Sequence, residues 1–286
     1  MDFRVLLASL IDGLMLGFVY GLAAMGLTLI WGVMRVINLA HGPIIALGMF
    51  GVYLLFVHGG VNPYLGLLIV AFLGLLFGIL IYALAVHRVL TAPHLSTLLA
   101  TFSVNMMIIG VGTALFTTTP RNIDISLGRL VFGPVVLLGT RLVAVLAAVF
   151  ITAALYLFLY RTTLGKMVRA VASNRAAAEL MGIPSSRVLA LSFGLGTMLA
   201  AAAGGLIATF FPFTILSGGT YELKSFVICV LGGLGNPTGA LVGGLILGAL
   251  EGLIPTFMPV SYVPVIEFLL FVLLLLLRPQ GLFGER

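Results

Sequence analysis

The sequence predicts an all-α integral membrane protein, a single transmembrane domain over residues 1–286 with about eight membrane-spanning helices. Three observations predict this class. Hydrophobic residues make up 62% of the chain and charged residues only 8%, whereas a soluble domain carries about 25% charged residues. Runs such as 142–160 and 188–211 contain no charge and are long enough to cross a bilayer. The net charge of +6 lies mostly in short connections, where it orients a membrane protein rather than binding nucleic acid.

For most of the expected spans the apolar pattern predicts a single helix. They cover residues 5–33, 43–58, 64–86, 95–116, 142–160, 188–211 and 263–277. In the first of them Gly13, Gly17 and Gly21 recur every four residues, a spacing that lets a neighbouring helix approach closely. Asn105, in the fourth, is expected to hydrogen-bond to a neighbouring helix, since polar side chains in a lipid-embedded bundle need a partner.

The stretch 221–254 is too long for one simple span. Its centre, GGLGNPTG at 232–239, cannot remain regular helix, because Pro237 removes a backbone donor and the glycines loosen the chain. We therefore expect two short helices that meet at a break. The connection before it, 212–220, is expected to be an outer turn, with Glu222 and Lys224 at the outer surface.

Two interruptions of the apolar pattern stand out: NLAHG at 38–42 and GGLGNPTG at 232–239, one in each half of the chain. Non-helical backbone at membrane depth survives only where protein or a wet cavity satisfies it. Paired interruptions indicate an internal repeat with a translocation path at its interface. The candidate path residues are Asn38, His41, Gly42, Gly232, Gly233, Gly235 and Asn236. Two simpler interpretations remain open: an interfacial His41 with its hydrogen bonds satisfied, and glycines that serve helix packing.

The connection 161–187 carries five of the fourteen Lys and Arg residues, which predicts a cytoplasmic loop. Ser173 or Asn174 can cap a short helix in this loop, and Gly182 followed by Pro184 ends it. The pattern by itself supports equally a helix that docks on a partner and one that lies on the membrane. The candidate docking residues are Asn174, Arg175, Ala177, Ala178, Glu179, Leu180, Met181 and Gly182.

Orientation follows from the same count of positive residues. Placing 161–187 inside leaves nine Lys and Arg inside, Arg286 among them, and five outside, provided that 221–254 crosses twice or enters and returns. The N-terminus is then external and the C-terminus cytoplasmic. The other long connection, 117–141, becomes an external loop, and its apolar piece 130–138, too short to span, is expected to be interfacial or re-entrant.

Sites for chemistry are not expected. The single cysteine, Cys229, excludes an internal disulfide and a multi-Cys metal site. The chain lacks GxxxxGK[ST] and the HExxH and GxSxG patterns, so we expect no catalytic residue, metal or cofactor. For Glu267 in the last span, a structural hydrogen bond is the leading interpretation, and pairing with an arginine of a partner subunit is the alternative.

Four segments carry a family resemblance: NLAHG, TTLGKMVRAVASNRAAAELMGI at 162–183, LKSFVICVLGGLGNPTGALVGG at 223–244 and RPQGLFG at 278–284. With these motifs the chain resembles the permease subunit of branched-chain amino acid ABC importers, the LivH-like group. The resemblance implies a heterodimer with a LivM-like permease, two cytoplasmic ATPase subunits that bind ATP, and an extracytoplasmic substrate-binding protein. It implies a location in the bacterial inner membrane, and it favours docking on an ATPase as the role of the loop helix.

The resemblance thus predicts a transporter subunit without enzymatic activity, half of a translocation path for branched-chain amino acids. Permeases of this type for urea, amides or other amino acids are an alternative. A secondary transporter coupled to protons or Na⁺ is a second one, which broken helices also suit. Against it, the acidic residues cluster toward the ends of the expected spans.

Overall fold

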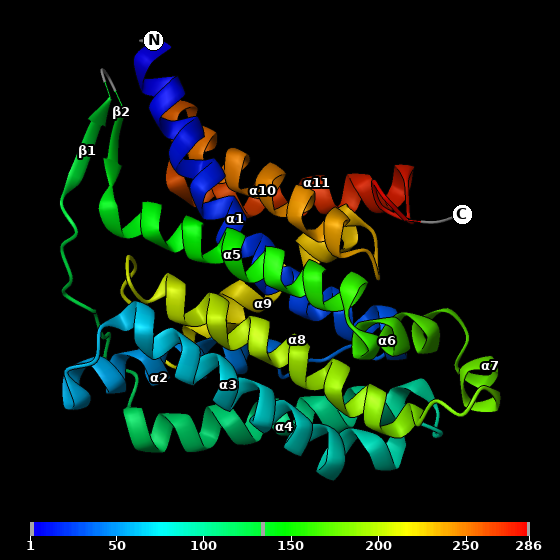
Figure 1. Cartoon of the computed structure of the whole chain (residues 1–286). Coiled ribbons are helices and arrows are strands. Elements are labelled where there is room, and N and C mark those ends of the chain that lie inside the picture. Colours follow the sequence, from blue (N-terminus) through cyan, green and yellow to red (C-terminus); the bar gives the residue numbers. More distant parts are fainter. Residues whose placement is uncertain (1–2, 133–134, 285–286) are drawn as a thin grey trace.

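The computed structural model describes residues 3–132 and 135–284, and in them the chain is a bundle of helices with one small hairpin (Figure 1). The helices are α1 (Phe3–Met34), α2 (His41–Gly59), α3 (Pro63–Ile81), α4 (His94–Phe116), α5 (Gly139–Arg161), α6 (Thr163–Ser173), α7 (Arg175–Leu180), α8 (Ser185–Ile207), α9 (Ser217–Gly232), α10 (Pro237–Phe257) and α11 (Val263–Leu277). A π-helical turn, Tyr82–Val86, and a 3-10 turn, His87–Val89, prolong α3.

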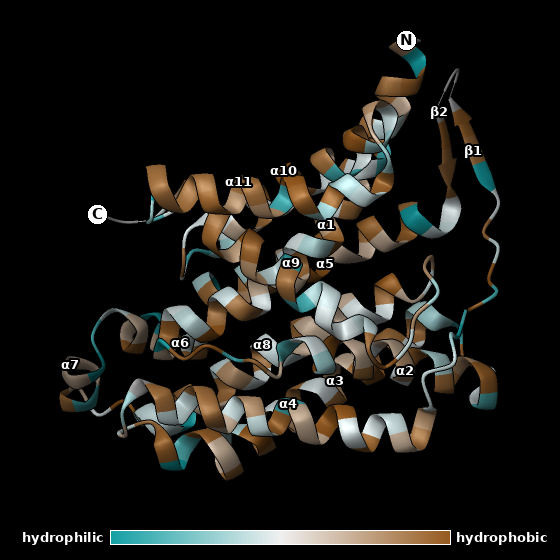
Figure 2. Ribbon diagram, turned by 180° about the vertical axis from the view of Figure 1, so that it is seen from behind, coloured by the Kyte–Doolittle hydropathy of each residue, from teal (hydrophilic) through white to brown (hydrophobic). Residues whose placement is uncertain are grey.

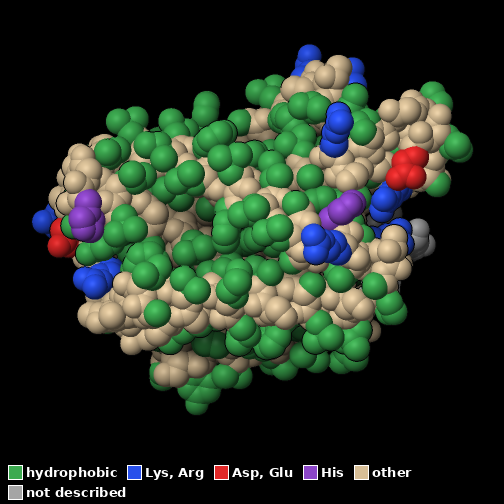
Figure 3. Space-filling model, turned by 90° about the horizontal axis from the view of Figure 1, so that it is seen from below, with side chains coloured by type: hydrophobic (Ala, Val, Ile, Leu, Met, Phe, Trp, Pro, Cys, Tyr) green, Lys and Arg blue, Asp and Glu red, His purple; other side chains and the backbone are tan. Residues whose placement is uncertain are grey.

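Eight helical segments within the described ranges are long and apolar enough to cross a membrane, as expected; α9, with 16 residues, is not among them. Hydrophobic residues dominate the long helices (Figure 2). On the face shown in Figure 3, hydrophobic side chains cover much of the surface, and charged ones lie at its left edge and in its right half. The bundle therefore presents the surface of a membrane-embedded protein.

The two ends of the bundle differ. The N-terminus and the hairpin lie at one end, and α6, α7 and the C-terminus lie at the other (Figures 1 and 2). The hairpin pairs β1 (Arg129–Phe132) with β2 (Val135–Leu138) in antiparallel register, Arg129 opposite Leu138. The apolar piece at 130–138, of which 133–134 lie outside the described residues, thus forms a β-ribbon. β-branched residues in both strands favour this pairing, and the interfacial or re-entrant position of the piece stays a prediction.

The core of the bundle is an internal repeat of inverted orientation, α1–α2–α3 and α8–α9–α10. In each half a long helix is followed by a non-helical segment, a helix that starts inside the bundle, and a helix antiparallel to it. The halves interlock, because α1 packs along α10 and α3 packs along α8. Figure 1 shows the first of these pairs in blue and orange.

Small residues allow these helices to touch. Gly17 of α1 lies against Gly244 of α10, and a Cβ atom at Gly17 would stand 2.6 Å from the Gly244 carbonyl oxygen. In the other half, Gly74 of α3 lies against Ala201 of α8. The spacing of glycines in the first span therefore predicted a real packing face.

The turns inside each half are related as well. Asn62 caps α3 by accepting a hydrogen bond from the Tyr64 backbone N–H, and Asn236 caps α10 in the same way from Gly239; a proline follows each asparagine. The segment GGLGNPTG therefore corresponds to the turn HGGVNP at 58–63 and does not correspond to NLAHG. The break expected in 221–254 is present. It is the turn between α9 and α10, which run antiparallel to each other.

Candidate functional site

The N-terminal ends of α2 and α9 meet inside the bundle, and we call this meeting point the α2–α9 junction (residues 41–42 and 217–219). Gly42 lies directly against the backbone of Gly218. His41 and Gly42 are buried, and the Nε2 atom of His41 donates to the carbonyl oxygen of Ala23, in the interior of α1, at 2.9 Å. Two helix N-termini, each the positive end of a helix dipole, thus point at one place.

The first half reaches the junction through the extended segment 35–40, which includes Asn38. Helix α4 satisfies two of the segment's carbonyl groups: Thr101 Oγ1 donates to Ile37 O at 3.1 Å, and Asn105 Nδ2 donates to Leu39 O at 2.5 Å. Asn105 therefore finds its partner in a neighbouring element, as expected, although that element is extended backbone instead of a helix. Helix α4 supplies the polar groups that let non-helical chain persist in the interior.

The second half reaches the junction through residues 208–216. Phe213 stacks edge-on against Phe50 of α2 with ring centroids 5.1 Å apart, and five residues later Gly218 meets Gly42. This segment thus runs along α2 toward the first turn of α2. The expected outer turn at 212–220 was wrong in its second part, since Ser217 already begins α9.

Three buried polar atoms around the first break lack a hydrogen-bond partner among the described residues: Asn38 Nδ2, His41 Nδ1 and Asn105 Oδ1. Since the Ala23 carbonyl can only accept, Nε2 of His41 carries a proton, and in the neutral ring Nδ1 is then a free acceptor. Unpaired polar groups in the interior are costly and therefore uncommon. Their concentration beside two helix N-termini marks the α2–α9 junction as the candidate site.

Glu222 belongs to this site, which corrects its expected position at the outer surface. It lies one turn into α9, is buried, and its Oε2 atom is 3.5 Å from Asn105 Nδ2. The backbone N–H of Gly42 is directed at the same carboxylate. Sequence reasoning missed this residue, because position 222 seemed to follow an outer turn. The available signal is the repeated Asn-Pro turn, because α2 begins 21 residues before Asn62 and α9 begins 19 residues before Asn236.

The other candidate path residues lie elsewhere. Gly232 and Gly233 end α9, and the C-terminal tail covers them: Phe283 N donates to Gly232 O at 3.2 Å, and Asn236 Nδ2 donates to Phe283 O at 3.1 Å. Gly235 lies against Gly32, near the last turn of α1. The structure thus brings Asn38, His41 and Gly42 together with Glu222 and Asn105, and it separates this group from Gly232, Gly233, Gly235 and Asn236.

A second polar cluster joins α1, α9, α10 and α11. Lys224 Nζ lies 2.5 Å from Glu251 Oε2 and 4.0 Å from Glu267 Oε1, and its ammonium stands 4.8 Å from the centre of the Tyr20 ring. Glu267 therefore has an ionic partner within its own chain. Lys224, like Glu222, lies inside the bundle, where its charge ties four helices together.

The loop helix forms as predicted. Asn174 caps α7 by accepting a hydrogen bond from Ala177 N at 3.0 Å, and Gly182 ends the helix with a φ of 80°. Arg175 Nε lies 3.0 Å from Glu179 Oε1, and this hydrogen bond lowers the pKa of Glu179. The amphipathic helix α6, capped by Thr162 and packed against α5, precedes it. The helix α7 thus projects from the bundle (Figure 1).

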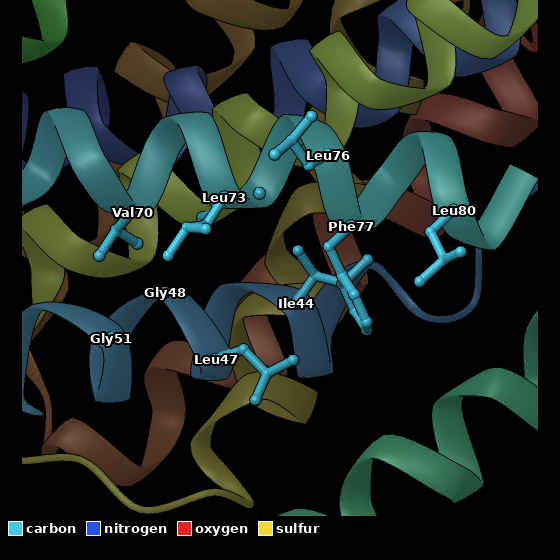
Figure 4. A pocket seen from close by; sticks show the side chains of 11 residues that line it. Ile44, Leu47, Gly48, Gly51, Val70, Leu73, Leu76, Phe77 and Leu80 are labelled. Carbon is cyan, nitrogen blue, oxygen red and sulfur yellow. The ribbon is translucent and has the colours of Figure 1, made fainter.

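Two apolar cavities lie between helices, and no residue of the α2–α9 junction lines either of them. One of about 410 Å³ lies between α2 and α3, where Leu47, Leu73 and Phe77 line it (Figure 4). The other, of about 450 Å³, is lined by α3, α5 and α8. Their walls are almost entirely hydrocarbon, which suits acyl chains better than a charged solute.

The sequence matches known proteins over nearly its whole length. Residues 9–277 match the family model described as branched-chain amino acid transport system, permease component. The chain is 29% identical to the high-affinity branched-chain amino acid transport system permease protein LivH of Escherichia coli (strain K12) and to LivH of Salmonella typhimurium, over 99% of this chain and 97% of each relative. It is also 29% identical to the corresponding permease BraD of Pseudomonas aeruginosa, over 98% of this chain and 96% of that protein.

No solved structure matches the chain. The family match covers the α2–α9 junction, α7 and all but the ends of the bundle. This chain therefore belongs to the family of permease components of branched-chain amino acid transport systems.

Proposed function

We propose that this chain is one permease subunit of an ATP-binding-cassette importer for branched-chain amino acids. It forms half of a translocation path, and partner subunits bind and hydrolyse ATP. A second permease, two ATPase subunits and an extracytoplasmic binding protein complete the importer. The family match supports the transport role, and the relatives' names supply the substrate class.

The observation that carries the coupling role is the exposure of α7. Leu180 and Met181 are 89% and 83% exposed, at the end of the bundle that also holds the C-terminus. Two large apolar side chains on a capped, projecting helix suit a groove on another protein. A membrane-surface helix is the competing role for α7.

We propose that this end is cytoplasmic and the hairpin end external. The connection 161–187 supports this orientation through its five positive residues. The antiparallel pair α9 and α10 supports a stretch 221–254 that crosses twice or enters and returns, which is the condition of the charge count. Arg286, which that count also uses, lies outside the described residues.

The path is proposed to run through the α2–α9 junction. Asn38, His41, Gly42, Asn105 and Glu222 contribute the polar groups that a zwitterion needs, and helix N-termini complement its carboxylate. The turn at 232–236 is proposed to seal the cytoplasmic end together with the tail at 281–284.

The decisive experiment is co-purification of the chain with its cognate ATPase subunit from membranes. Deletion of residues 176–179, or Glu179→Arg, should abolish association while the chain still inserts and keeps its oligomeric profile. The matched control is Asp124→Arg, a charge reversal in the exposed connection at the other end. Association that persists after the deletion would remove the coupling role from α7.

Broken helices also suit an ion-coupled secondary transporter. Uptake by the reconstituted complex separates the two functions. An importer of the proposed kind stops when ATP is withheld and ignores collapse of the proton gradient. Uptake that continues without ATP and fails with the gradient supports the secondary transporter. Competition by urea, amides or other amino acids for the cognate binding protein tests the substrate class.

A further inference from the structure

Glu222 is a buried acid without a counter-ion. Every other acidic side chain within the described helices has one: Asp12 pairs with Arg141, Glu179 with Arg175, and Glu251 and Glu267 share Lys224. No Lys, Arg or His nitrogen among the described residues lies within 4.0 Å of the Glu222 carboxylate. A charged group inside a membrane domain is costly and marks a functional site whose partner must be identified.

We propose that Glu222 and Asn105 form the binding site for the ammonium group of the transported substrate. This inference rests on the proposed importer function and deepens it, since it assigns the recognition of one substrate group to two residues of this chain. The site lies where α4 and α9 face each other beside the first turn of α2.

The hydrogen bonds around Asn105 define which ligand group the site can bind. Its Nδ2 atom is held by Leu39 O at 2.5 Å and points toward Glu222 Oε2 at 3.5 Å, which leaves Oδ1 buried and without a partner. The site therefore offers two acceptors, the Glu222 carboxylate and the free Oδ1 atom of the Asn105 side chain, whose amide nitrogen faces that carboxylate. An ammonium group brings three donors and one positive charge, so it satisfies both acceptors and neutralises Glu222.

Other ligand groups fit less well. A carboxylate would be repelled by Glu222, and a hydroxyl or amide would leave the buried charge uncompensated. A zwitterion is favoured over a simple amine, because the positive end of the α9 dipole lies one turn from Glu222 and complements a carboxylate. An α-amino acid carries these two charges on neighbouring groups.

The site adjoins an open surface. Gly219 and Thr220, in the first turn of α9, are exposed, and nothing lies within 4 Å of where a Cβ atom at Gly219 would stand. Glu222 follows Gly219 by one turn of helix and thus lies on the same side of α9. A solute that reaches Gly219 therefore lies one helical turn from the carboxylate.

A cysteine at Gly219 can report the charge of this site without relying on transport. The experiment uses the assembled importer with Cys229→Ala, so that Gly219→Cys provides the reactive thiol of this chain. The modification rates with a cationic reagent (methanethiosulfonate ethylammonium) and an anionic one (methanethiosulfonate ethylsulfonate) are compared. We expect Glu222→Gln to lower the cation-to-anion ratio about tenfold, the effect of removing one nearby charge. Leucine should lower the rate at which the cationic reagent modifies Gly219→Cys only when Glu222 is present.

The matched control is Glu251→Gln, which removes an acid of the same bundle that already pairs with Lys224. It should leave the ratio at Gly219→Cys unchanged. An unchanged ratio in Glu222→Gln, or an equal fall in both variants, would overturn the proposal.

Transport of matched solutes provides the second test. Leucine and 4-methylpentanoate share their hydrocarbon and carboxylate, and only leucine carries the ammonium. We expect Glu222→Gln to reduce leucine uptake at least about tenfold while the complex still contains both permeases and the ATPase. Glu222→Asp should retain more uptake than Glu222→Gln.

Two outcomes would assign Glu222 a different partner and overturn the proposal. Loss of the second permease from the Glu222→Gln complex would identify a cation of that subunit as the partner. Undiminished leucine uptake that merely loses its pH dependence would identify a proton. Failure of the wild-type chain to associate with any ATPase would overturn the importer function itself. That result differs from a failure of the Glu222 site, which appears only as a difference between variants and wild type.

Discussion

Gly42 of α2 and Gly218 of α9 lie backbone to backbone, so that a Cβ atom at Gly42 would stand 2.5 Å from the Gly218 carbonyl oxygen and 2.6 Å from Oε2 of Glu222. This contact joins the two halves of the inverted repeat at their centre. It explains why glycine occupies the first turn of each helix, where any side chain would separate the two N-termini.

Substitution Gly42→Ala should therefore damage both stability and transport. The added methyl meets backbone atoms that cannot move independently, so we expect a loss of about 1–3 kcal/mol in unfolding free energy and a strong loss of uptake. Thermal unfolding in detergent and uptake in proteoliposomes measure the two effects. The control is Gly110→Ala in α4, where nothing lies within 4 Å. Equal behaviour of the two variants would show that the junction tolerates a wider separation.

Removal of the Lys224 ammonium should destabilise the polar cluster that joins α1, α9, α10 and α11. In Lys224→Met the carboxylates of Glu251 and Glu267 lose their shared counter-ion, and breaking a buried pair in this way costs about 3–5 kcal/mol. A lower midpoint of thermal unfolding in detergent is the expected readout. Lys166→Met, at an exposed position of α6, should have no comparable effect. A midpoint within error of wild type would mean that water already screens the cluster.

The two exposed apolar residues of α7 should carry most of its contact with the ATPase. We expect Leu180→Glu to weaken association by about 10–30-fold, because a charged side chain cannot enter an apolar groove and central contacts are worth about 1.4–2 kcal/mol. Quantitative pull-down of the ATPase subunit measures the change. Leu127→Glu, at a 43% exposed position in the connection at the other end, is the control. Retained association in Leu180→Glu would favour a membrane-surface role for α7.

Orientation can be read from the accessibility of single cysteines. In a Cys229→Ala background, Met181→Cys should react with a membrane-impermeant maleimide only in inside-out vesicles, because 161–187 is the most basic connection. Asp124→Cys should react in intact cells. The reverse pattern would invert the assignment and detach α7 from any cytoplasmic partner.

Much of the fold could be predicted from local pattern. Spans such as 95–116 and 263–277 coincide with α4 and α11, since a run of apolar residues long enough to cross the membrane must form helix there. The cap at Asn174 and the end at Gly182 were also local, because capping depends on side chains within one turn.

The candidate site was only half predictable. Asn38, His41 and Gly42 interrupt an apolar run with polar residues, so that sequence alone marks them. The partner break at 208–216 is itself apolar in large part, with Phe210, Phe211 and Phe213, and it hides within the hydropathy pattern. The Gly-rich turn at 232–239 was expected to be the second break of the path, but it connects α9 to α10.

By itself the sequence determined the membrane class, the order of the spans, the capped loop helix and the absence of nucleotide-binding patterns, since hydropathy, charge and capping act over one or two turns of chain. Only the tertiary structure decided how deep each break lies and which residues meet there. The non-helical segment 208–216 carries the chain from beside Phe50 back to Gly42, and nothing local records that reversal. It is this reversal that carries Glu222 from an apparent surface position to Gly42 and Asn105 in the interior.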